Sequence, residues 1–492
     1  MKKIIEHIVL TIFVANIALL ASCSGFEEMN EDPNRISYGY APPTKLLMSI
    51  IYNGHWTVYY RSYWVNNNLM QYAVYWASSN DVSNYNLSAS DMLAPWRDLY
   101  RWSSSANHMY KVAIEYDDPN CMAIALTLKV YMMEVVTSLY GDVPYSEAMQ
   151  WDEVPERPKY DLQSDIYKMM LDELDQANKL YVLTRNLDYP ARDLLYNGDI
   201  AKWQKFTNSL RLRLLMRVSK CTEINAPAMM QEMINNPATY PIFTSNTDAA
   251  ILRYTGETPF YNQFGTMGGY DVMGTNSRLG KTLLDLMNLP EDPRRAFYAT
   301  ARNGIYEGMA SGQDGDYTAA ILDIACNYNG NLSTNTSPST LMNYAELLFI
   351  KAEAAFRGFI TGDVESYYNE GVAASVREWT GSEAYDVTPF LSHESVSYNN
   401  TLLRIMEQKY ISQFLCGFES WCDYRRTGLP EMPIGPIMAN RNENGVPTMP
   451  TRVIYPLITQ SANGENYKAA VERMGGKDDM LTKLWFANGT RY

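Results

Sequence analysis

The stretch CMAIALTLKVYMMEVVTSLY, from Cys121 to Tyr140, is mostly apolar and is followed by Gly141 and then Pro144. Glycine readily adopts the left-handed conformation that closes a helix, and proline cannot continue one. The pattern therefore predicts a buried helix that ends at Tyr140. A helix this apolar on every side needs other elements around it, so it indicates a fold built on packed helices.

Helical spacing recurs on both sides of this stretch. One face of a long helix is marked by an aromatic stripe, which comprises Tyr52, Trp56, Tyr59, Tyr60 and Tyr63. Asp199 has the side chain and position of a helix N-cap. Further helices are expected over residues 161–183, 200–218, 341–356, 363–379 and 402–414.

Paired helices joined by short turns predict a mostly α fold, a tetratricopeptide-like array of helical hairpins with an irregular, loop-rich excursion. Residues 254–338 hold 11 of the 28 glycines, which is typical of loops. We expect a single body over residues 44–492. Its parts are helical segments at 44–240 and 340–427, the excursion at about 241–339, and an irregular tail at 428–492.

The N-terminus has the pattern of an export signal. Lys2 and Lys3 precede an apolar run, and small residues then lead to Cys23. This resembles a bacterial lipoprotein signal at residues 1–22, followed by a lipidated tether at 23–43; an ordinary secretory signal with a chance cysteine is the alternative. No later segment has 18 consecutive apolar residues, so we expect membrane contact through the lipid anchor only.

The charge balance excludes one class of partner. Lys and Arg total 41 against 55 Asp and Glu, a net charge of −14, whereas nucleic-acid binding requires clustered basic residues.

Five cysteines remain after Cys23, too few and too widely spaced for a disulfide scaffold. Cys416 and Cys422 are close enough in sequence to pair, but we favour buried thiols.

The motifs of common enzymes are absent from the sequence. It contains no H-E-x-x-H pair, no P-loop and no G-x-S-x-G elbow. We therefore predict a protein that is not an enzyme and that has no cofactor and no catalytic metal. A pair of carboxylates could still act as in a glycosidase, and a structural calcium ion is compatible with Asp314-Gly315-Asp316.

Aromatic residues are concentrated in one region. Thirteen Tyr and Trp residues lie between Tyr52 and Trp102, and Trp76 enters a small polar loop. A tryptophan at a loop mouth can stack on a sugar ring, or it can plug the end of a helical core. The first interpretation predicts a shallow site for an oligosaccharide or a peptide, with residues Trp76, Asn80, Asp81, Asn84, Tyr85, Tyr254 and Tyr261.

Several segments together resemble the SusD/RagB family of surface lipoproteins. In chain order they are LYGDVPYSEA (139–148), WQKFTNSLRLRLLMRVS (203–219), AELLFIKAEAA (345–355), QKYI, GFESW and DYRRTG (within 408–428), and RVIYP (452–456). The polar tether after Cys23, SGFEEMNEDPN, also resembles the segment with which mature proteins of that family begin.

The resemblance implies a lipoprotein of the outer membrane that faces the exterior and partners a SusC-like TonB-dependent barrel. It implies glycan ligands, or peptides in some members, and no catalysis. Because ligand loops diverge in such a family, it transfers no ligand residue to this chain. A nutrient-binding lid is thus the expected function; a surface glycosidase and a structural adhesin are the alternatives.

Overall fold

A computed structural model describes residues 41–76, 82–90, 92–149, 155–268 and 273–489. One compact unit spans Pro43–Tyr492 and contains every element below. The unit is mostly helical, with tetratricopeptide-like hairpins, as the sequence predicts. Cys23, Asn80 and Asp81 lie outside the described residues.

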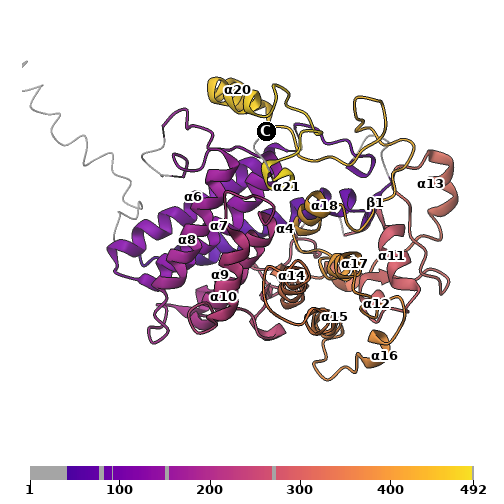
Figure 1. Ribbon diagram of the computed structural model, residues 1–492, viewed down its shortest axis with the longest axis horizontal. Coiled ribbons are helices and arrows are strands. Elements are labelled where there is room, and N and C mark those ends of the chain that lie inside the picture. The colour runs from indigo at the N-terminus through magenta and orange to yellow at the C-terminus, as the bar shows by residue number, and fades with distance from the viewer. Residues whose placement is uncertain (1–40, 77–81, 91, 150–154, 269–272, 490–492) are drawn as a thin grey trace, which may run out of the picture. The chain divides into compact units, whose positions relative to one another are not determined.

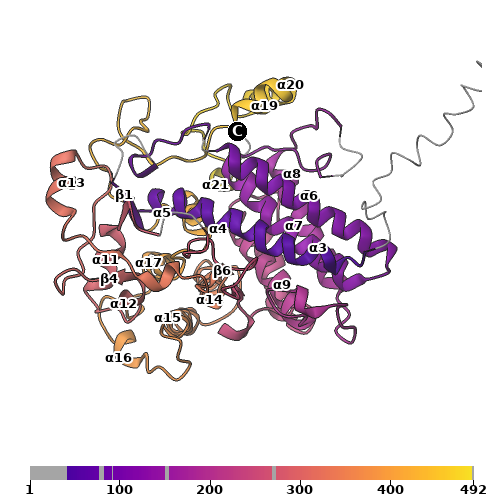
Figure 2. The same cartoon turned by 180° about the vertical axis from the view of Figure 1, so that it is seen from behind.

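The N-terminal half forms a layer of helices that pack in chain order, α6 on α7, α7 on α8 and α8 on α9. The short connection between Glu115 and Pro119 makes α6 and α7 an antiparallel hairpin, whereas longer segments join α7 to α8 and α8 to α9. Figures 1 and 2 show this layer on the side of the unit opposite α11 and α13. The helices are α3 (Thr44–Ser49), α4 (His55–Trp64), α5 (Asn66–Leu69), α6 (Leu93–Glu115), α7 (Pro119–Tyr140), α8 (Gln163–Leu180), α9 (Ile200–Arg217) and α10 (Ala226–Asn235).

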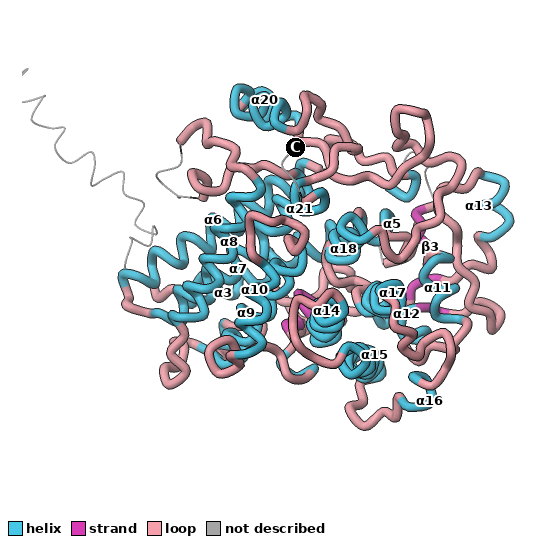
Figure 3. The backbone as a smooth tube through the Cα atoms, in the orientation of Figure 1, coloured by secondary structure: helices cyan, strands magenta, loops and turns pink. Residues whose placement is uncertain are grey.

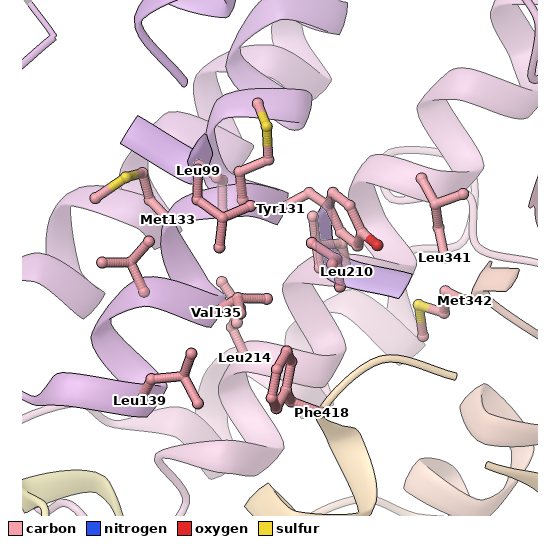
Figure 4. Packing of buried hydrophobic residues seen from close by; sticks show 14 of the residues in the cluster. Leu99, Tyr131, Met133, Val135, Leu139, Leu210, Leu214, Leu341, Met342 and Phe418 are labelled. Carbon is pink, nitrogen blue, oxygen red and sulfur yellow. The ribbon is translucent and has the colours of Figure 1, made fainter. Parts of the chain in front are cut away.

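Helix α7 is the centre of this layer. Asp118 accepts a hydrogen bond from the backbone N–H of Cys121 at its start, and Gly141 closes it with a φ of 94°. Its most apolar 18 residues are long and hydrophobic enough to cross a membrane, but 94% of that window is buried inside the fold. Figure 4 shows part of the surrounding core, where Val135 and Leu139 lie near Leu214 and Phe418. The predicted helix and its end are confirmed.

A π-helical turn, η2 (Ile50–Gly54), joins α3 to α4. Most of the aromatic stripe is core: Tyr52, Trp56, Tyr59 and Tyr63 are buried. Tyr60 is half-buried and points to a different surface, described below.

The C-terminal helices form a second layer, in which α14 packs on α15 and α17 and also contacts α9 of the first layer. Asn343 and Asp363 cap α14 and α15 with their side chains. The helix expected from residue 341 begins later, because Leu341 and Met342 belong to a strand that ends at the Asn343 cap. The helices are α14 (Tyr344–Phe356), α15 (Val364–Thr380), α16 (Thr388–Leu391), α17 (Leu402–Ser412) and α18 (Glu419–Thr427).

Buried ion pairs join the two layers. The Arg213 guanidinium donates to both oxygens of Glu346, with Nε–Oε1 and Nη2–Oε2 distances of 2.7 Å. Arg217, one turn further along α9, pairs with Glu134 of α7 and Glu419 of α18. All five side chains are buried, so α7, α9, α14 and α18 are tied by buried charges.

The predicted excursion contains short elements among its loops (Figure 3). Its strands and the earlier strand β1 pair antiparallel in three two-stranded ladders, β1 with β3, β2 with β6 and β4 with β5. The strands are β1 (Ala73–Tyr75), β2 (Ala250–Leu252), β3 (Ser277–Leu279), β4 (Ala299–Thr300), β5 (Asn327–Tyr328) and β6 (Ser339–Met342). The helices of the excursion are α11 (Lys281–Asn288), α12 (Arg295–Tyr298) and α13 (Gly315–Ile321), with 3₁₀ turns η5 (Asn246–Asp248) and η6 (Gly330–Ser333). Two further 3₁₀ turns, η3 (Val82–Asn84) and η4 (Pro190–Arg192), belong to the N-terminal half.

The tail after α18 is irregular except for three short helices, α19 (Leu457–Ala462), α20 (Gly464–Arg473) and α21 (Trp485–Asn488). The five cysteines within the described ranges are buried free thiols, which confirms that Cys416 and Cys422 do not pair.

Candidate ligand-binding site

Tyr75 stands at the edge of the loop-rich side, and Asn68 fixes its position. The Asn68 Oδ1 atom accepts hydrogen bonds from the Tyr75 backbone N–H at 3.1 Å and from the Ser83 hydroxyl at 2.6 Å. The Asn68 amide group also donates to the carbonyl of Trp64 at 2.9 Å. One buried side chain thus ties α4, β1 and η3 together, and strand β3 holds β1 from the other side.

A cavity of about 340 Å³, the Trp64 cavity, opens beside this junction. Aromatic rings and polar groups alternate around it. Its lining residues are Tyr60, Arg61, Trp64, Val65, Asn68, Tyr75, Val82, Asn86, Ser88 and Met92.

The aromatic rings that line this cavity contact neighbouring side chains in its wall. The Trp64 ring meets the Tyr75 ring edge-on with centroids 5.5 Å apart, and the Arg61 guanidinium lies 5.1 Å from the Tyr60 centroid. The indole N–H of Trp64 is buried and has no hydrogen-bond partner among the described residues. Such a donor is costly to leave unpaired, so it favours a ligand that brings an acceptor.

A second cavity of about 310 Å³, the Trp76 cavity, shares Tyr75 as a wall. Trp76 and Asn84 line it from one side, and residues on and before α13, among them Gly312, Asp314 and Thr318, line it from the other. The two segments predicted to build the site, the Trp76 loop and the excursion, do meet here.

Trp76 itself is half-buried. Its ring packs beside the small cluster of Val74, Met309 and Ala325, and the Arg278 guanidinium lies 5.7 Å from its centroid. Its indole N–H is buried and unpartnered within the described ranges, as in Trp64. Trp76 therefore packs on the fold and also lines a cavity, and its stacking on a sugar ring stays a prediction.

The other predicted residues are dispersed. Asn80 and Asp81 lie outside the described residues. Tyr85 is fully buried, and its hydroxyl accepts a hydrogen bond from Gln71. Tyr254 is buried with its hydroxyl on Ser339, whereas Tyr261 is half-buried and its carbonyl accepts from the Tyr52 hydroxyl. Neither Tyr254 nor Tyr261 lines either cavity.

Sequence reasoning missed Tyr60, Arg61, Trp64 and Tyr75 as site residues. The sequence pattern places Tyr60 in the aromatic stripe. It is four residues before Trp64, so the two share a helix face, and that face borders the cavity. An arginine between them, on a helix otherwise rich in aromatic residues, was the available signal. The contribution of Tyr75 depends on a strand partner two hundred residues away, which no local pattern reveals.

We find no group of three metal-ligating side chains in the part of the chain that the structure describes. Asp314, considered above for calcium, serves as the N-cap of α13 and accepts from the Tyr317 backbone N–H. The two cavities offer ring faces for stacking, amide and hydroxyl groups, and one cation. This arrangement suits the binding of a ligand rich in hydroxyl or amide groups.

A helical-hairpin scaffold with aromatic cavities on its loop-rich side defines a class of binding proteins. The chain belongs to the SusD-like family described as "starch-binding associating with outer membrane", whose profile matches residues 33–456. Proteins of this family bind their ligands rather than transform them, and the family associates with the outer membrane. No match to the chain is found among curated protein sequences.

Solved structures agree with this assignment. A chitin-binding protein is 26% identical with a TM-score of 0.77, over 91% of this chain and 99% of its own. A SusD homologue from Bacteroides uniformis is 25% identical with a TM-score of 0.77, over 90% and 99%. A SusD homologue from Bacteroides fragilis, 24% identical with a TM-score of 0.75 over 90% and 98%, shares the fold.

Proposed function

We propose that this protein is a lipid-anchored receptor on the cell surface that captures a glycan and passes it to a SusC-like TonB-dependent barrel. The glycan binds across the Trp64 and Trp76 cavities, which meet at Tyr75. Cys23 carries the lipid anchor, and the polar tether that follows connects it to the folded unit.

One observation supports this function above the others. Each of the two adjoining cavities has a tryptophan whose buried indole N–H lacks a partner in the described structure. An indole has only a donor, so a ligand that pairs with it supplies an acceptor oxygen beside an apolar ring face. Sugars offer hydroxyl oxygens on the edge of a ring and C–H groups on its face, and therefore match both requirements.

The relatives support a glycan before a peptide. The family description names starch, and one similar structure is that of a chitin-binding protein. Charged residues are also few in these cavities, since Arg61 is the one charged residue that lines the Trp64 cavity and Asp314 the one that lines the Trp76 cavity.

The ligand is tested by affinity electrophoresis and calorimetry with a panel of soluble polysaccharides, starch and chitin oligosaccharides included, and of peptides. We expect a polysaccharide to bind and Trp64→Ala to weaken it about ten- to a hundredfold, as for the loss of one stacking aromatic. Tyr189→Ala is the matched control, because Tyr189 is 59% exposed and lies far from both cavity linings in sequence. Binding of peptides alone, or equal affinity in the Trp64 variant, contradicts the proposed glycan site.

The anchor and the partner need a separate test in cells. Cys23→Ala should release the folded protein from the outer-membrane fraction of a strain that lacks the barrel. Co-purification of the wild-type protein with the barrel, and not with the inner membrane, is the expected result. Release of reducing sugar from a bound glycan by the purified protein would instead support the glycosidase alternative.

A further inference from the structure

A third cavity, the Glu378 cavity, shares no residue with the other two. It has a volume of about 220 Å³ and lies between the end of α15, the paired strands β2 and β6, and the residues after α17. Its walls include four aromatic side chains, Tyr59, Phe297, Trp379 and Phe414. Such a volume is below the roughly 300–1,000 Å³ of pockets for drug-sized molecules, so the cavity suits one small molecule and not an oligosaccharide.

Glu378 provides a carboxyl group to this cavity without any protein partner. Within the described part of the chain, neither carboxyl oxygen makes a hydrogen bond or an ion pair, and Oε2 is buried. Burial raises the pKa of this carboxyl to about 7, although the nearby Arg253 lowers it. Glu378 also lies in the last turn of α15, where the helix dipole disfavours negative charge. This carboxyl group therefore has no ion-pair partner within 4.0 Å among the described residues.

Arg253 lies at the mouth of the same cavity, directly after β2. It is exposed, and no acceptor bonds its guanidinium among the described residues. Its charge reaches Glu378, yet the two groups form no ion pair within 4.0 Å. The cavity therefore has a buried negative group inside and a positive group at its rim, with space between them.

Contacts within the protein hold other groups that line the cavity. The Trp379 ring packs edge-on against Tyr298 with centroids 4.4 Å apart. Ser339 at the wall bonds the Nε2 atom of His55 at 2.9 Å and the Tyr254 hydroxyl at 2.8 Å. A pre-formed apolar wall with fixed polar groups reduces the ordering that a ligand would otherwise require.

We propose that the Glu378 cavity is a second binding site, which takes a small zwitterion of the α-amino acid type. The ligand's ammonium group pairs with Glu378, its carboxylate pairs with Arg253, and its side chain lies against the aromatic wall. An ammonium between aromatic rings and a carboxylate is favoured by both cation–π attraction and a charge-assisted hydrogen bond.

Simpler ligands fit this charge arrangement less well. A plain cation would be repelled by Arg253, and a plain anion by Glu378. A neutral sugar would bury the carboxyl group without neutralising it, which leaves its desolvation cost in place. This inference does not depend on the proposed glycan function, because the two sites have no residue in common.

The test is ligand-observed saturation-transfer NMR with the full-length mature protein and a panel of the twenty amino acids. We expect apolar amino acids such as L-leucine to bind. L-leucinamide lacks the carboxylate and N-acetyl-L-leucine lacks the ammonium group, so both should bind at least tenfold more weakly. Glucose at equal concentration reports any general affinity for sugars.

Two variants and one control locate the binding. Glu378→Gln preserves the shape and removes the charge, and Arg253→Gln alters an exposed side chain that the fold does not use; each should weaken L-leucine at least tenfold. Glu383→Gln removes an exposed carboxylate that lies outside the cavity lining, although its charge acts on Glu378, and should weaken L-leucine less than twofold. Trp64→Ala should leave L-leucine bound while it impairs glycan binding.

The proposal is overturned if no amino acid binds, or if L-leucine binds equally to the Glu378→Gln protein. It is also overturned if L-leucinamide or N-acetyl-L-leucine binds as well as L-leucine, because one of the two charged contacts is then absent. If Glu378→Gln fails to fold, Arg253→Gln alone decides whether the cavity binds the carboxylate.

Discussion

Buried polar groups of the helical layers and of the loop-rich side differ in the partners that they have within the protein. Between the layers, the charges of Arg213 and Arg217 are matched by carboxylates on three other helices. On the loop-rich side and at its border, the indole N–H groups of Trp64 and Trp76 and the carboxyl of Glu378 lack protein partners in the described structure. Single buried polar atoms without a partner also occur within the layers, such as the Ser164 hydroxyl, but Trp64, Trp76 and Glu378 are residues that line cavities.

This difference separates stability from binding. A charge in the layers has a specific partner, so its loss leaves another charge buried and alone. A group in a cavity has no protein partner to lose, so its removal should change affinity far more than folding. The predictions below test this separation, beginning with the largest effect.

Arg213→Met should be the most damaging single change, because it leaves the Glu346 carboxylate buried without its partner. We expect a loss of about 3–5 kcal/mol in the free energy of unfolding, measured by urea denaturation. Arg97→Ala is the matched control, because Arg97 is 65% exposed in its pair with Asp98 and should cost about 1 kcal/mol or less. Similar losses in the two variants would mean that the buried network is not what joins the layers.

Acidification should weaken the fold through His55. Burial lowers the pKa of His55 from 6.5 to about 3, so the unfolded chain takes up a proton below pH 6.5 that the folded protein does not. Stability contributed by this residue is therefore complete above pH 6.5 and is lost as the pH falls, by about 2 kcal/mol between pH 7 and pH 5. Urea titrations at several pH values should show a shallower dependence in His55→Gln than in the wild-type protein or in His393→Gln.

Trp76→Ala tests a residue that both packs on the fold and lines a cavity. We expect glycan affinity to fall by about ten- to a hundredfold, since a stacking ring and an N–H donor are both lost. The melting temperature should fall much less than in Arg213→Met, because Trp76 is only half-buried. A variant that melts several degrees earlier and binds glycan normally would identify Trp76 as a structural plug.

The smallest effect should come from reduction. The five described cysteines are unpaired, so excess dithiothreitol should leave the melting temperature and the ligand affinity of the mature protein unchanged. A lower melting temperature on reduction would reveal a disulfide, with Cys416 and Cys422 as the nearest pair in sequence.

Helices were predictable from this sequence because their signals are local. Asp199 and Asp363 cap helices through backbone groups three residues away, and Gly141 ends α7 as its position indicates. The short strands were not predictable, since β1 has three residues and pairs with a strand two hundred residues later. A three-residue strand has too little periodicity to be distinguished from a loop.

The residues of the candidate site were predictable only where they are close together in the sequence. Trp76 and Asn84 flank one polar loop, and the structure places both in one cavity. Tyr85, beside Asn84, faces the core instead, because its backbone adopts a left-handed conformation with a φ of 59°. The Trp64 cavity requires Asn68 to join three elements, and such a contact depends on the complete fold.

The shared wall at Tyr75 has a consequence for ligand length under the proposed glycan function. A ligand long enough to enter both cavities is held at the second by its attachment at the first, which gives the second contact a high effective concentration. Affinity should rise steeply when an oligosaccharide first spans Tyr75 and then level off, because both cavities are then occupied. The protein would then select polymers over their monomers without any contact that distinguishes the two chemically.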